Sequence, residues 1–221
     1  MDVWGTLQGF DGPLFRSVNH AGTNFGLDLL MVFFTVIGLS YILIILVVPL
    51  WIWKLKERAF DLVILIVSSD IVSEVLKQIF ERPRPFDVLS DVHMLRWDGL
   101  TGASGFSFPS GHALRVFAIG VYFLYRVSGR VKLVSLSAAV LIGISRIYLG
   151  LHWPTDVMAG AAIGAVLACT VIIVGRKPGR YSAARRRVVR AVEGWVAKVR
   201  KRSATSSQFA VASVTPQIVR E

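Results

Sequence analysis

Residues 29–53, LLMVFFTVIGLSYILIILVVPLWIW, run for 25 positions without a charged side chain. About 20 apolar helical residues are enough to cross the roughly 30 Å of hydrocarbon in a bilayer. A stretch of this length and composition is typical of a transmembrane helix rather than of the core of a soluble domain. We therefore expect this segment to cross a membrane as one helix, tilted because it is longer than the crossing requires.

Four more apolar stretches follow, each of about bilayer length. They cover residues 59–80, 110–127, 131–150 and 155–175, and several of them contain polar side chains. In residues 1–26 the apolar positions fall at helical spacing among polar ones, which is typical of a helix lying along the membrane interface. We expect an all-α, polytopic transmembrane helical bundle of five spans, with six spans as the alternative.

The composition argues against both an ordinary soluble protein and a nucleic-acid-binding one. Of the 221 residues, 54% are hydrophobic and 18% are charged, which is too apolar for a soluble globule. A net charge of +11 would be typical of nucleic-acid binding if the cations were spread over the chain. Instead, 11 of the 25 Lys and Arg residues lie between Arg176 and Arg202, behind the last apolar stretch. We therefore expect no nucleic-acid partner.

The distribution of Lys and Arg predicts which way the spans face. Cations in short loops remain on the cytoplasmic side of a membrane. With five alternating spans, the loops at 54–58 and 126–132 and the basic tail fall on one side. We therefore expect a multi-pass protein of the inner or cytoplasmic membrane, with its C-terminus in the cytoplasm. The connection 81–109 and the turn at His152 then face the periplasm or the exterior.

These features divide the chain into four segments. Residues 1–26 form the interfacial N-terminal segment, and residues 27–175 form the transmembrane core. Residues 176–202 combine an apolar stripe with a basic face, which predicts an amphipathic helix lying on anionic lipid. A solvated run of charges that only fixes the topology is the alternative. Residues 203–221 have no periodic pattern, and we expect them to be unstructured.

Three polar clusters lie at the ends of the apolar stretches, and alternating spans bring all three to the outer side. They comprise Lys77 and Arg84 after the second stretch, Ser110, Gly111 and His112 at the start of the third, and Ser145, Arg146, His152 and Asp156 between the fourth and fifth. Three cations gathered near a membrane surface are costly to desolvate unless an anion neutralises them. The clusters therefore predict an anion-binding site.

The residue types in these clusters favour a tetrahedral oxyanion such as phosphate. Arg84 and Arg146 suit bidentate contacts, and Lys77 suits a point contact. The Ser110 hydroxyl and the backbone amides of residues 110–112 would add donors at the start of a helix, where the helix dipole also favours an anion.

The two histidines are the candidates for chemistry on that anion. His152 and Asp156 are four residues apart, so the carboxylate could hold one imidazole nitrogen and stabilise the imidazolium. This favours His152 as a nucleophile that forms a phosphohistidine. His112 lies at the predicted phosphate-binding turn and is the candidate proton donor to the leaving oxygen, and then the base for the hydrolytic water. Neither step requires a metal or another cofactor.

The patterns K-x6-R-P, P-S-G-H and S-R-x5-H-x3-D occur in this order at residues 77–85, 109–112 and 145–156. In all three the chain resembles the type-2 phosphatidic acid phosphatase family of integral-membrane lipid phosphatases, which shares its site with vanadium haloperoxidases. The resemblance covers residues 27–175. It implies a helical-bundle phosphatase acting on a lipid phosphate or diphosphate. Polyprenyl diphosphate, phosphatidylglycerophosphate and phosphatidic acid are the substrates that it suggests.

The resemblance also assigns roles to the residues of the three patterns. Phosphate would be bound by Lys77, Arg84, Ser110, Gly111 and Arg146, with His112 as acid and base and His152 as the nucleophile supported by Asp156. The family more often has six spans than five. A second departure is Arg115, a cation one turn after His112, which either touches the substrate or pairs with an intramembrane acid.

Three alternative functions remain open from the residues. A metal site would use His112, His152 and Asp156 as two histidines and a carboxylate, but the nearby cations disfavour a divalent ion. A vanadate-dependent peroxidase would use the same anion pocket, yet such chemistry does not require embedding in a membrane. A non-catalytic binder or transporter of lipid phosphates would need the pocket but not the histidine nucleophile.

Other intramembrane polar and small residues have a supporting interpretation. Asp70 and Glu74 share a helix face with Lys77, and we expect them to pair with cations rather than to catalyse. Gly160 and Gly164 form a G-x-x-x-G pattern, which we expect to allow close helix packing within the bundle rather than dimerisation.

Overall fold

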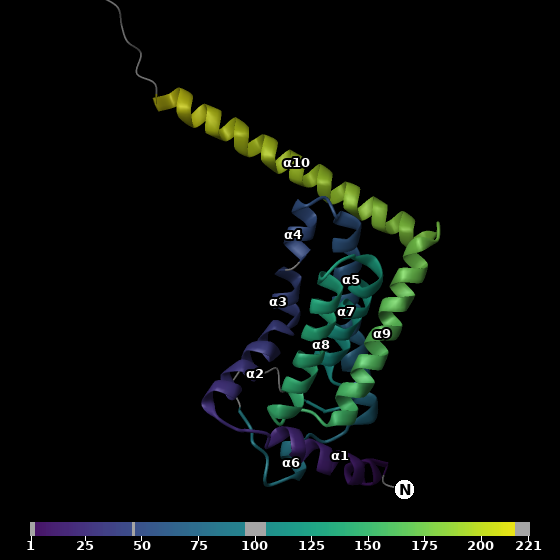
Figure 1. Cartoon of the computed structure of the whole chain (residues 1–221). Helices are drawn as coiled ribbons and strands as arrows, with labels where there is room; N and C mark the ends of the chain where they lie inside the picture. Colours follow the sequence, from purple (N-terminus) through teal and green to yellow (C-terminus); the bar gives the residue numbers. More distant parts are fainter. Residues whose placement is uncertain (1–2, 46, 96–104, 215–221) are drawn as a thin grey trace, which may run out of the picture. The chain divides into compact units, whose positions relative to one another are not determined.

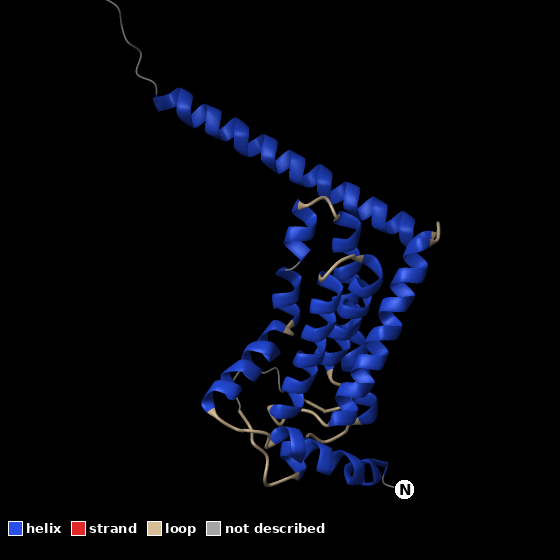
Figure 2. Cartoon of the chain, in the orientation of Figure 1, coloured by secondary structure: helices blue, strands red, loops and turns tan. Residues whose placement is uncertain are grey.

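The computed structural model describes residues 3–45, 47–95 and 105–214, and these residues are helical or in loops, without strands (Figure 2). The chain forms two compact units, Met1–Arg176 and Lys177–Glu221. The helices are α1 (Val3–Asn19), α2 (Phe25–Ile37), α3 (Ser40–Ile45), α4 (Val47–Ile52), α5 (Lys56–Phe80), α6 (Pro85–Val88), α7 (Gly111–Arg126), α8 (Val131–Tyr148), α9 (Pro154–Arg176) and α10 (Arg180–Val214).

The uncharged stretch 29–53, expected to cross the membrane as one helix, is divided among α2, α3 and α4. The axis bends by 62° between Phe25–Ile37 and Ser40–Ile52. The bend falls at Gly38, where a Cβ atom would lie 2.8 Å from Ile142 Cγ2 and 2.9 Å from His112 Cδ2. The Gly38 carbonyl accepts a hydrogen bond from Arg115 Nη1 at 2.5 Å. Side chains of other helices therefore contact the backbone at this position, which hydropathy alone does not reveal.

Helix α7 lies at the centre of the first unit, packed against α5, α8 and α9 (Figure 1). Its contact with α9 is made through small residues. A Cβ atom on Gly160 would lie 2.6 Å from the Ser110 carbonyl oxygen, and one on Gly164 would lie 2.2 Å from the Leu114 carbonyl oxygen. The G-x-x-x-G pattern therefore serves helix packing within the chain, as expected from the sequence.

Helix α5 places two of its acidic residues against the bundle and large apolar residues away from it. Asp61 and Asp70 receive hydrogen bonds from Tyr122 and Arg115 of α7. The opposite face exposes large aliphatic side chains, namely Val63, Val67, Ile71, Val75 and Ile79. Polar residues inside and apolar residues outside are the arrangement of a helix surrounded by lipid.

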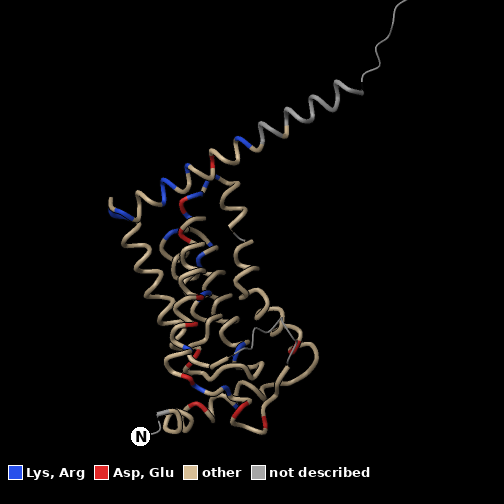
Figure 3. The backbone as a smooth tube through the Cα atoms, turned by 180° about the vertical axis from the view of Figure 1, so that it is seen from behind, with Lys and Arg blue, Asp and Glu red and all other residues tan. Residues whose placement is uncertain are grey.

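Two helices in the described part of the chain, α8 and α9, are long and apolar enough to span a membrane. The bent pair formed by α2 and residues 40–52 makes a third if it counts as one span. Figure 3 shows that α9 carries no charged residue between Asp156 and Arg176, whereas charged residues recur along α5. The spans expected at residues 59–80 and 110–127 correspond to α5 and α7, which are not among the helices identified by length and composition.

Helix α1 lies across the end of the bundle at which α8 ends and α9 begins (Figure 1). Asn19 Nδ2 donates to the carbonyl oxygens of His93 and Tyr148, both at 2.8 Å, and joins α1 to the connection after α6 and to the end of α8. Part of the predicted outer connection 81–109, residues 96–104, lies outside the described residues.

The second unit consists mainly of α10. The helix extends past the predicted amphipathic segment 176–202 into the segment expected to be unstructured, and it ends at Val214. Residues 215–221 of that segment lie outside the described residues. Val188, Val192, Trp195 and Val199 recur at helical spacing and are exposed.

Candidate active site

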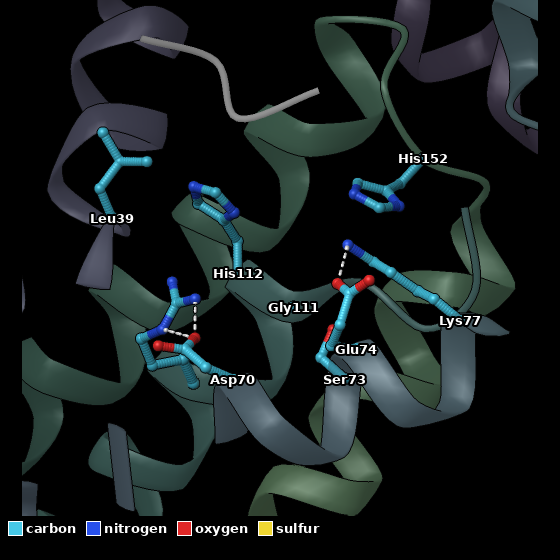
Figure 4. Close-up of a pocket in the computed structure, with 9 residues that line it drawn as sticks. Leu39, Asp70, Ser73, Glu74, Lys77, Gly111, His112 and His152 are labelled. Carbon is cyan, nitrogen blue, oxygen red and sulfur yellow. Dashed lines mark hydrogen bonds and ion pairs between the residues drawn. The ribbon is translucent and has the colours of Figure 1, made fainter. Parts of the chain in front are cut away.

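The three polar clusters meet at one end of the bundle, where α5 ends, α7 begins and the connection from α8 to α9 turns. A pocket of about 400 Å³ opens there. Its lining consists of Leu39, Asp70, Ser73, Glu74, Lys77, Gly111, His112, Arg115 and His152. Figure 4 shows the rings of His112 and His152 on opposite sides of the opening, with Glu74 and Lys77 near His152. Four of the eight predicted site residues therefore line one pocket.

The hydrogen bonding of His152 defines its tautomer. Its Nδ1 lies 2.8 Å from the carbonyl oxygen of Ser107. A carbonyl oxygen can only accept a hydrogen bond, so Nδ1 carries the proton in the neutral ring. The lone pair of the neutral imidazole is then on Nε2. This is the protonation state that a nucleophilic imidazole requires.

The surroundings of His152 keep its imidazole neutral. Burial and the nearby positive charges, Arg84 first and then Arg146 and Lys77, hold the pKa of His152 well below its ordinary value of 6.5. The hydrogen bond to the Ser107 carbonyl opposes this shift because it favours the protonated ring. A neutral, unprotonated Nε2 is therefore available at neutral pH.

Asp156 supports His152 differently from the expected direct hydrogen bond. Its Oδ2 lies 3.6 Å from His152 Nδ1, an ion-pair distance, while the hydrogen bond of Nδ1 goes to Ser107. Asp156 Oδ2 accepts hydrogen bonds from the Ser107 hydroxyl and, at 2.8 Å, from the backbone N–H of Trp153. The carboxylate thus caps the first turn of α9 and reaches His152 partly through Ser107, which corrects the predicted geometry.

His112 is buried in the first turn of α7, and its Nε2 has no hydrogen-bond partner in the described structure. A buried nitrogen without a hydrogen-bond partner is uncommon, and here it indicates that a bound ligand supplies the missing partner. Gly38 leaves the space that the ring occupies, because a Cβ atom there would lie 2.9 Å from His112 Cδ2. His112 is therefore positioned to exchange a proton with a molecule in the pocket.

Lys77 comes from the last turn of α5, and its side chain is 14% exposed. Its Nζ lies 3.9 Å from Glu74 Oε2, and Glu74 Oε1 accepts a hydrogen bond of 3.1 Å from Gln78. The predicted pairing of Glu74 with Lys77 is thus present. Glu74 provides the negative charge that accompanies Lys77 in the pocket.

Arg84 and Arg146 are almost completely buried and do not line the pocket. Arg84 donates through Nε to the Gly105 carbonyl and through Nη1 to the Leu151 carbonyl, both at 2.8 Å. Arg146 Nη1 lies 2.5 Å from Thr35 Oγ1. Both guanidinium groups are close enough to act electrostatically on His152. The two buried arginines therefore contribute positive electrostatic potential to the pocket without lining it.

Ser110 is the N-cap of α7, as the P-S-G-H pattern indicates, and its hydroxyl accepts from the backbone N–H of Ala113 at 3.5 Å. Its own backbone N–H donates to the Asp156 carbonyl at 3.0 Å. This amide is not free to bind an anion, which corrects one part of the prediction. Gly111 lines the pocket closely against α5, where a Cβ atom would meet Ser73 Oγ at 2.8 Å.

Arg115 pairs with an intramembrane acid, one of the two interpretations that its sequence position allowed. Its Nε lies 3.0 Å from Asp70 Oδ1, and its Nη2 also contacts that oxygen. The other oxygen of Asp70 accepts from the Ser40 hydroxyl at 2.8 Å. Arg115 still borders the pocket, but its charge is neutralised by Asp70.

Arg82, Ser107 and Asp11 are site residues that sequence reasoning missed. Arg82 lies two residues before Arg84, the arginine of the K-x6-R-P pattern, in the run R-P-R-P, and this repeat is the only local signal for it. Ser107 and Asp11 carry no such signal. Among the described residues, no three His, Cys, Asp or Glu side chains are grouped so that they could hold a metal ion.

A helical bundle with apolar outer faces and a cationic pocket containing two histidines is typical of a membrane-embedded hydrolase of phosphate esters. The model of the PAP2 superfamily matches residues 58–180, and the chain belongs to this superfamily. The membership confirms the family indicated by the three sequence patterns. It also confirms that the chain is an enzyme of a hydrolase family located in a membrane.

Similar proteins include several named lipid phosphatases. The undecaprenyl-diphosphatase of Sulfolobus acidocaldarius is 33% identical over 157 residues, which cover 71% of this chain and 74% of that protein. Phosphatidylglycerophosphatase B of Bacillus subtilis is 39% identical over 117 residues, which cover 48% of this chain and 53% of that protein.

Two crystal structures share the fold. The structure of Aquifex aeolicus LpxE is 32% identical in sequence, has a TM-score of 0.66, and is matched over 74% of this chain and 94% of that chain. The PAP2-type phosphatidylglycerolphosphate phosphatase from Bacillus subtilis is 26% identical, has a TM-score of 0.65, and is matched over 80% of this chain and 89% of that chain.

Proposed function

We propose that the protein is a phosphatase that removes a terminal phosphate from a lipid phosphate or diphosphate by way of a phosphohistidine. The main observation behind this proposal is that His152 and His112 both line the same pocket. The first has its Nδ1 proton held by the Ser107 carbonyl, and the second has an unpartnered Nε2. The lipid phosphatases among the relatives support a lipid substrate.

In the first step Nε2 of His152 attacks phosphorus, and the bond between phosphorus and the lipid oxygen breaks. His112 donates a proton to that oxygen, so the lipid leaves as an alcohol or as a lipid monophosphate. In the second step His112 takes a proton from water, which attacks the phosphohistidine and releases inorganic phosphate. His152 returns to its neutral state.

The cations have the task of stabilising the transferring phosphoryl group. Lys77 lines the pocket, and Arg84 and Arg146 add positive potential from behind it. Fixed charges in a site shielded from water stabilise the charge of the transition state without reorganising. Gly111 would let backbone N–H donors at the start of α7 approach the phosphate closely. The Ser110 hydroxyl, at the N-cap of the same helix, would lie near the phosphate. These groups supply the stabilisation, so no step here requires a metal.

We further propose that the site faces the periplasm or exterior of a cytoplasmic membrane, and that the C-terminus is cytoplasmic. The basic loops at 54–58 and 126–132 and the basic C-terminal segment support this orientation. Polyprenyl diphosphate, phosphatidylglycerophosphate and phosphatidic acid are the candidate substrates. All three present a phosphate on a lipid chain at the membrane surface.

The C-terminal helix is proposed to bind anionic lipid. Val188, Val192, Trp195 and Val199 provide an apolar stripe, and Lys and Arg residues recur along the same helix (Figure 3). Helices of this kind lie in the headgroup region of anionic membranes. The tryptophan fluorescence of the wild-type protein minus that of Trp195→Phe, measured with vesicles, tests the proposal. A blue shift with phosphatidylglycerol vesicles but not with phosphatidylcholine vesicles is expected, and no shift with either contradicts it.

The test of the proposed function is phosphate release by detergent-purified protein offered a panel of lipid phosphates, lipid diphosphates and soluble phosphate esters. We expect release from lipids, inhibition by vanadate, and collapse of turnover in His152→Ala with lipid binding retained. Full turnover in His152→Ala would instead support a lipid-phosphate binder or transporter with a contaminating activity. Oxidation of bromide by peroxide in the presence of vanadate would support the peroxidase alternative.

A further inference from the structure

Arg82 lies in a buried ionic network behind His152, outside the pocket. Its side chain is 1% exposed, and Nη1 contacts Asp156 Oδ1 at 2.5 Å and Thr155 Oγ1 at 2.8 Å. Nη2 contacts Asp11 Oδ2 at 2.5 Å. One guanidinium therefore joins the carboxylate that supports His152 to a carboxylate from the N-terminal helix.

Asp11 is held on its other side by the start of α9. Its Oδ1 accepts from the backbone N–H of Thr155 at 3.0 Å, and its Oδ2 accepts from the Thr155 hydroxyl at 2.5 Å. Asp11 is fully buried although it belongs to α1, which exposes Phe10 and Leu14 on its outer side. A buried carboxylate with three donor contacts has a defined position, and it holds Arg82 in place through their ion pair.

Two indole rings flank the same guanidinium. The Arg82 Cζ atom lies 4.9 Å from the ring centre of Trp4 and 5.3 Å from that of Trp153. These rings exclude water and favour one orientation of the guanidinium plane. Since Trp4 and Asp11 both belong to α1, this helix supplies two of the groups that fix Arg82.

The charges in the network suit the reaction. Arg82 alone would neutralise Asp156, leaving no net charge to stabilise a positively charged His152. With Asp11 added, two carboxylates share one guanidinium, and the network keeps one net negative charge. That charge is needed when His152 becomes cationic on bonding to phosphorus.

We propose that Arg82 and Asp11 are positioning residues for the Asp156–His152 pair, so that helix α1 is part of the catalytic machinery. Asp11 lies outside residues 58–180, which the superfamily model matches. The inference rests on the proposed phosphatase function of His152. It predicts that a change in α1, remote from the substrate, alters the chemical step.

The central variant is Asp11→Asn, which keeps the size of the side chain and removes one negative charge. We expect kcat to fall about 10–100-fold, as for other residues that orient a catalytic group. KM should change little, because Asp11 does not line the pocket. The decisive readout is the acid limb of the pH profile of kcat/KM, which should move to lower pH because the imidazolium of His152 loses a stabilising charge.

The other charged and titratable groups that act on His152 must stay unchanged in this comparison. They are Lys77 of α5, Arg84 of the following loop, His112 of α7, Arg146 of α8 and Asp156 of α9. Because Asp11→Asn alters none of them, a shift of the acid limb reports the network itself. A purely structural role would lower activity without moving that limb.

Asp91→Asn is the matched control. Asp91 also binds a residue of α1, with its Oδ2 at 2.8 Å from Arg16 Nε, but that pair is exposed at about half of each side chain. The substitution removes the same charge and loosens the same helix. We expect wild-type kcat and an unmoved acid limb, since exposed pairs contribute little.

Asp11→Glu restores the charge and should recover most of kcat and the wild-type acid limb. If Asp11→Asn does not fold, Thr155→Val tests the same network, because it removes a hydroxyl that contacts both Arg82 and Asp11. It should lower kcat at least about threefold without shifting the limb. Wild-type kcat and pH profile in a folded Asp11→Asn, or wild-type kcat in Thr155→Val, would overturn the inference. Absence of phosphate release by the wild-type protein would instead refute the proposed function.

Discussion

Replacing Gly164 by alanine tests whether the spacing of α7 and α9 determines the geometry of the active site. The new Cβ atom would lie 2.2 Å from the Leu114 carbonyl oxygen and 3.0 Å from the Ala118 nitrogen. Both obstacles are backbone atoms of α7 and cannot rotate away. The helices must separate locally by about 0.8 Å before the first contact reaches 3.0 Å, the shortest distance found for real Cβ atoms.

This displacement affects both catalytic histidines. Helix α7 carries His112, and α9 begins directly after His152 and contains Asp156. A misplacement of about 1 Å can cost on the order of 10²-fold in rate, and overpacking typically costs about 1–3 kcal/mol of stability. We therefore expect Gly164→Ala to lower kcat by about 10²-fold and to lower the unfolding temperature in detergent. Phosphate release and a thermal unfolding curve measure the two effects.

Two further substitutions complete the test. Gly160→Ala should be milder, because its Cβ atom would lie 2.6 Å from the Ser110 carbonyl oxygen and needs less separation. Gly9→Ala is the control, since no atom lies within 4 Å of a Cβ there, and it should leave both measurements unchanged or raise stability slightly. Wild-type kcat and stability in Gly164→Ala would refute the argument that the backbone contact of α7 and α9 sets the site.

Three other outcomes are expected. Because the pKa of His152 is depressed, the unfolded chain binds a proton that the folded chain releases, so stability of the ligand-free protein should rise as pH increases toward about 6.5. His152→Gln should reduce this slope in unfolding temperature, and an unchanged slope would show that other groups cause it. Glu74→Gln should lower KM for lipid phosphates several-fold by freeing Lys77, with the exposed Glu81→Gln as control, and an unaltered KM would contradict the competition between Glu74 and phosphate. Gly111→Ala should impair phosphate release because its Cβ atom would lie 2.8 Å from Ser73 Oγ, and adding Ser73→Ala should restore it unless the loss has another cause.

The helical segments were largely predictable because hydropathy reports the surroundings of each residue along the chain. Residues 131–150 and 155–175 correspond closely to α8 and α9. The bend within residues 29–53 was not predicted, because an uncharged run of residues carries no sign of where a helix bends. The bend at Gly38 depends on contacts with His112, Ile142 and Arg115, which are remote in sequence.

The candidate site was predictable where a pattern combined local spacing with a helix end. Ser110 is the N-cap of α7, and Lys77, His112 and His152 meet in one pocket. The spacing of His152 and Asp156 was less informative. The first turn of α9 uses the Asp156 carboxylate to accept the Trp153 amide, so it reaches His152 only at 3.6 Å.

Sequence alone determined that the chain is a membrane-embedded helical protein of the phosphatase family, and that Lys77, His112 and His152 come together. Those conclusions depend on composition and on spacings of a few residues. The tertiary structure decided what holds the histidines: the Ser107 carbonyl on His152, Arg82 on Asp156, and Asp11 on Arg82. These partners are 45, 74 and 71 residues apart, and contacts over such separations arise only when helices pack. No local sequence pattern predicts these contacts, because Ser107, Arg82 and Asp11 do not stand out from the residues around them.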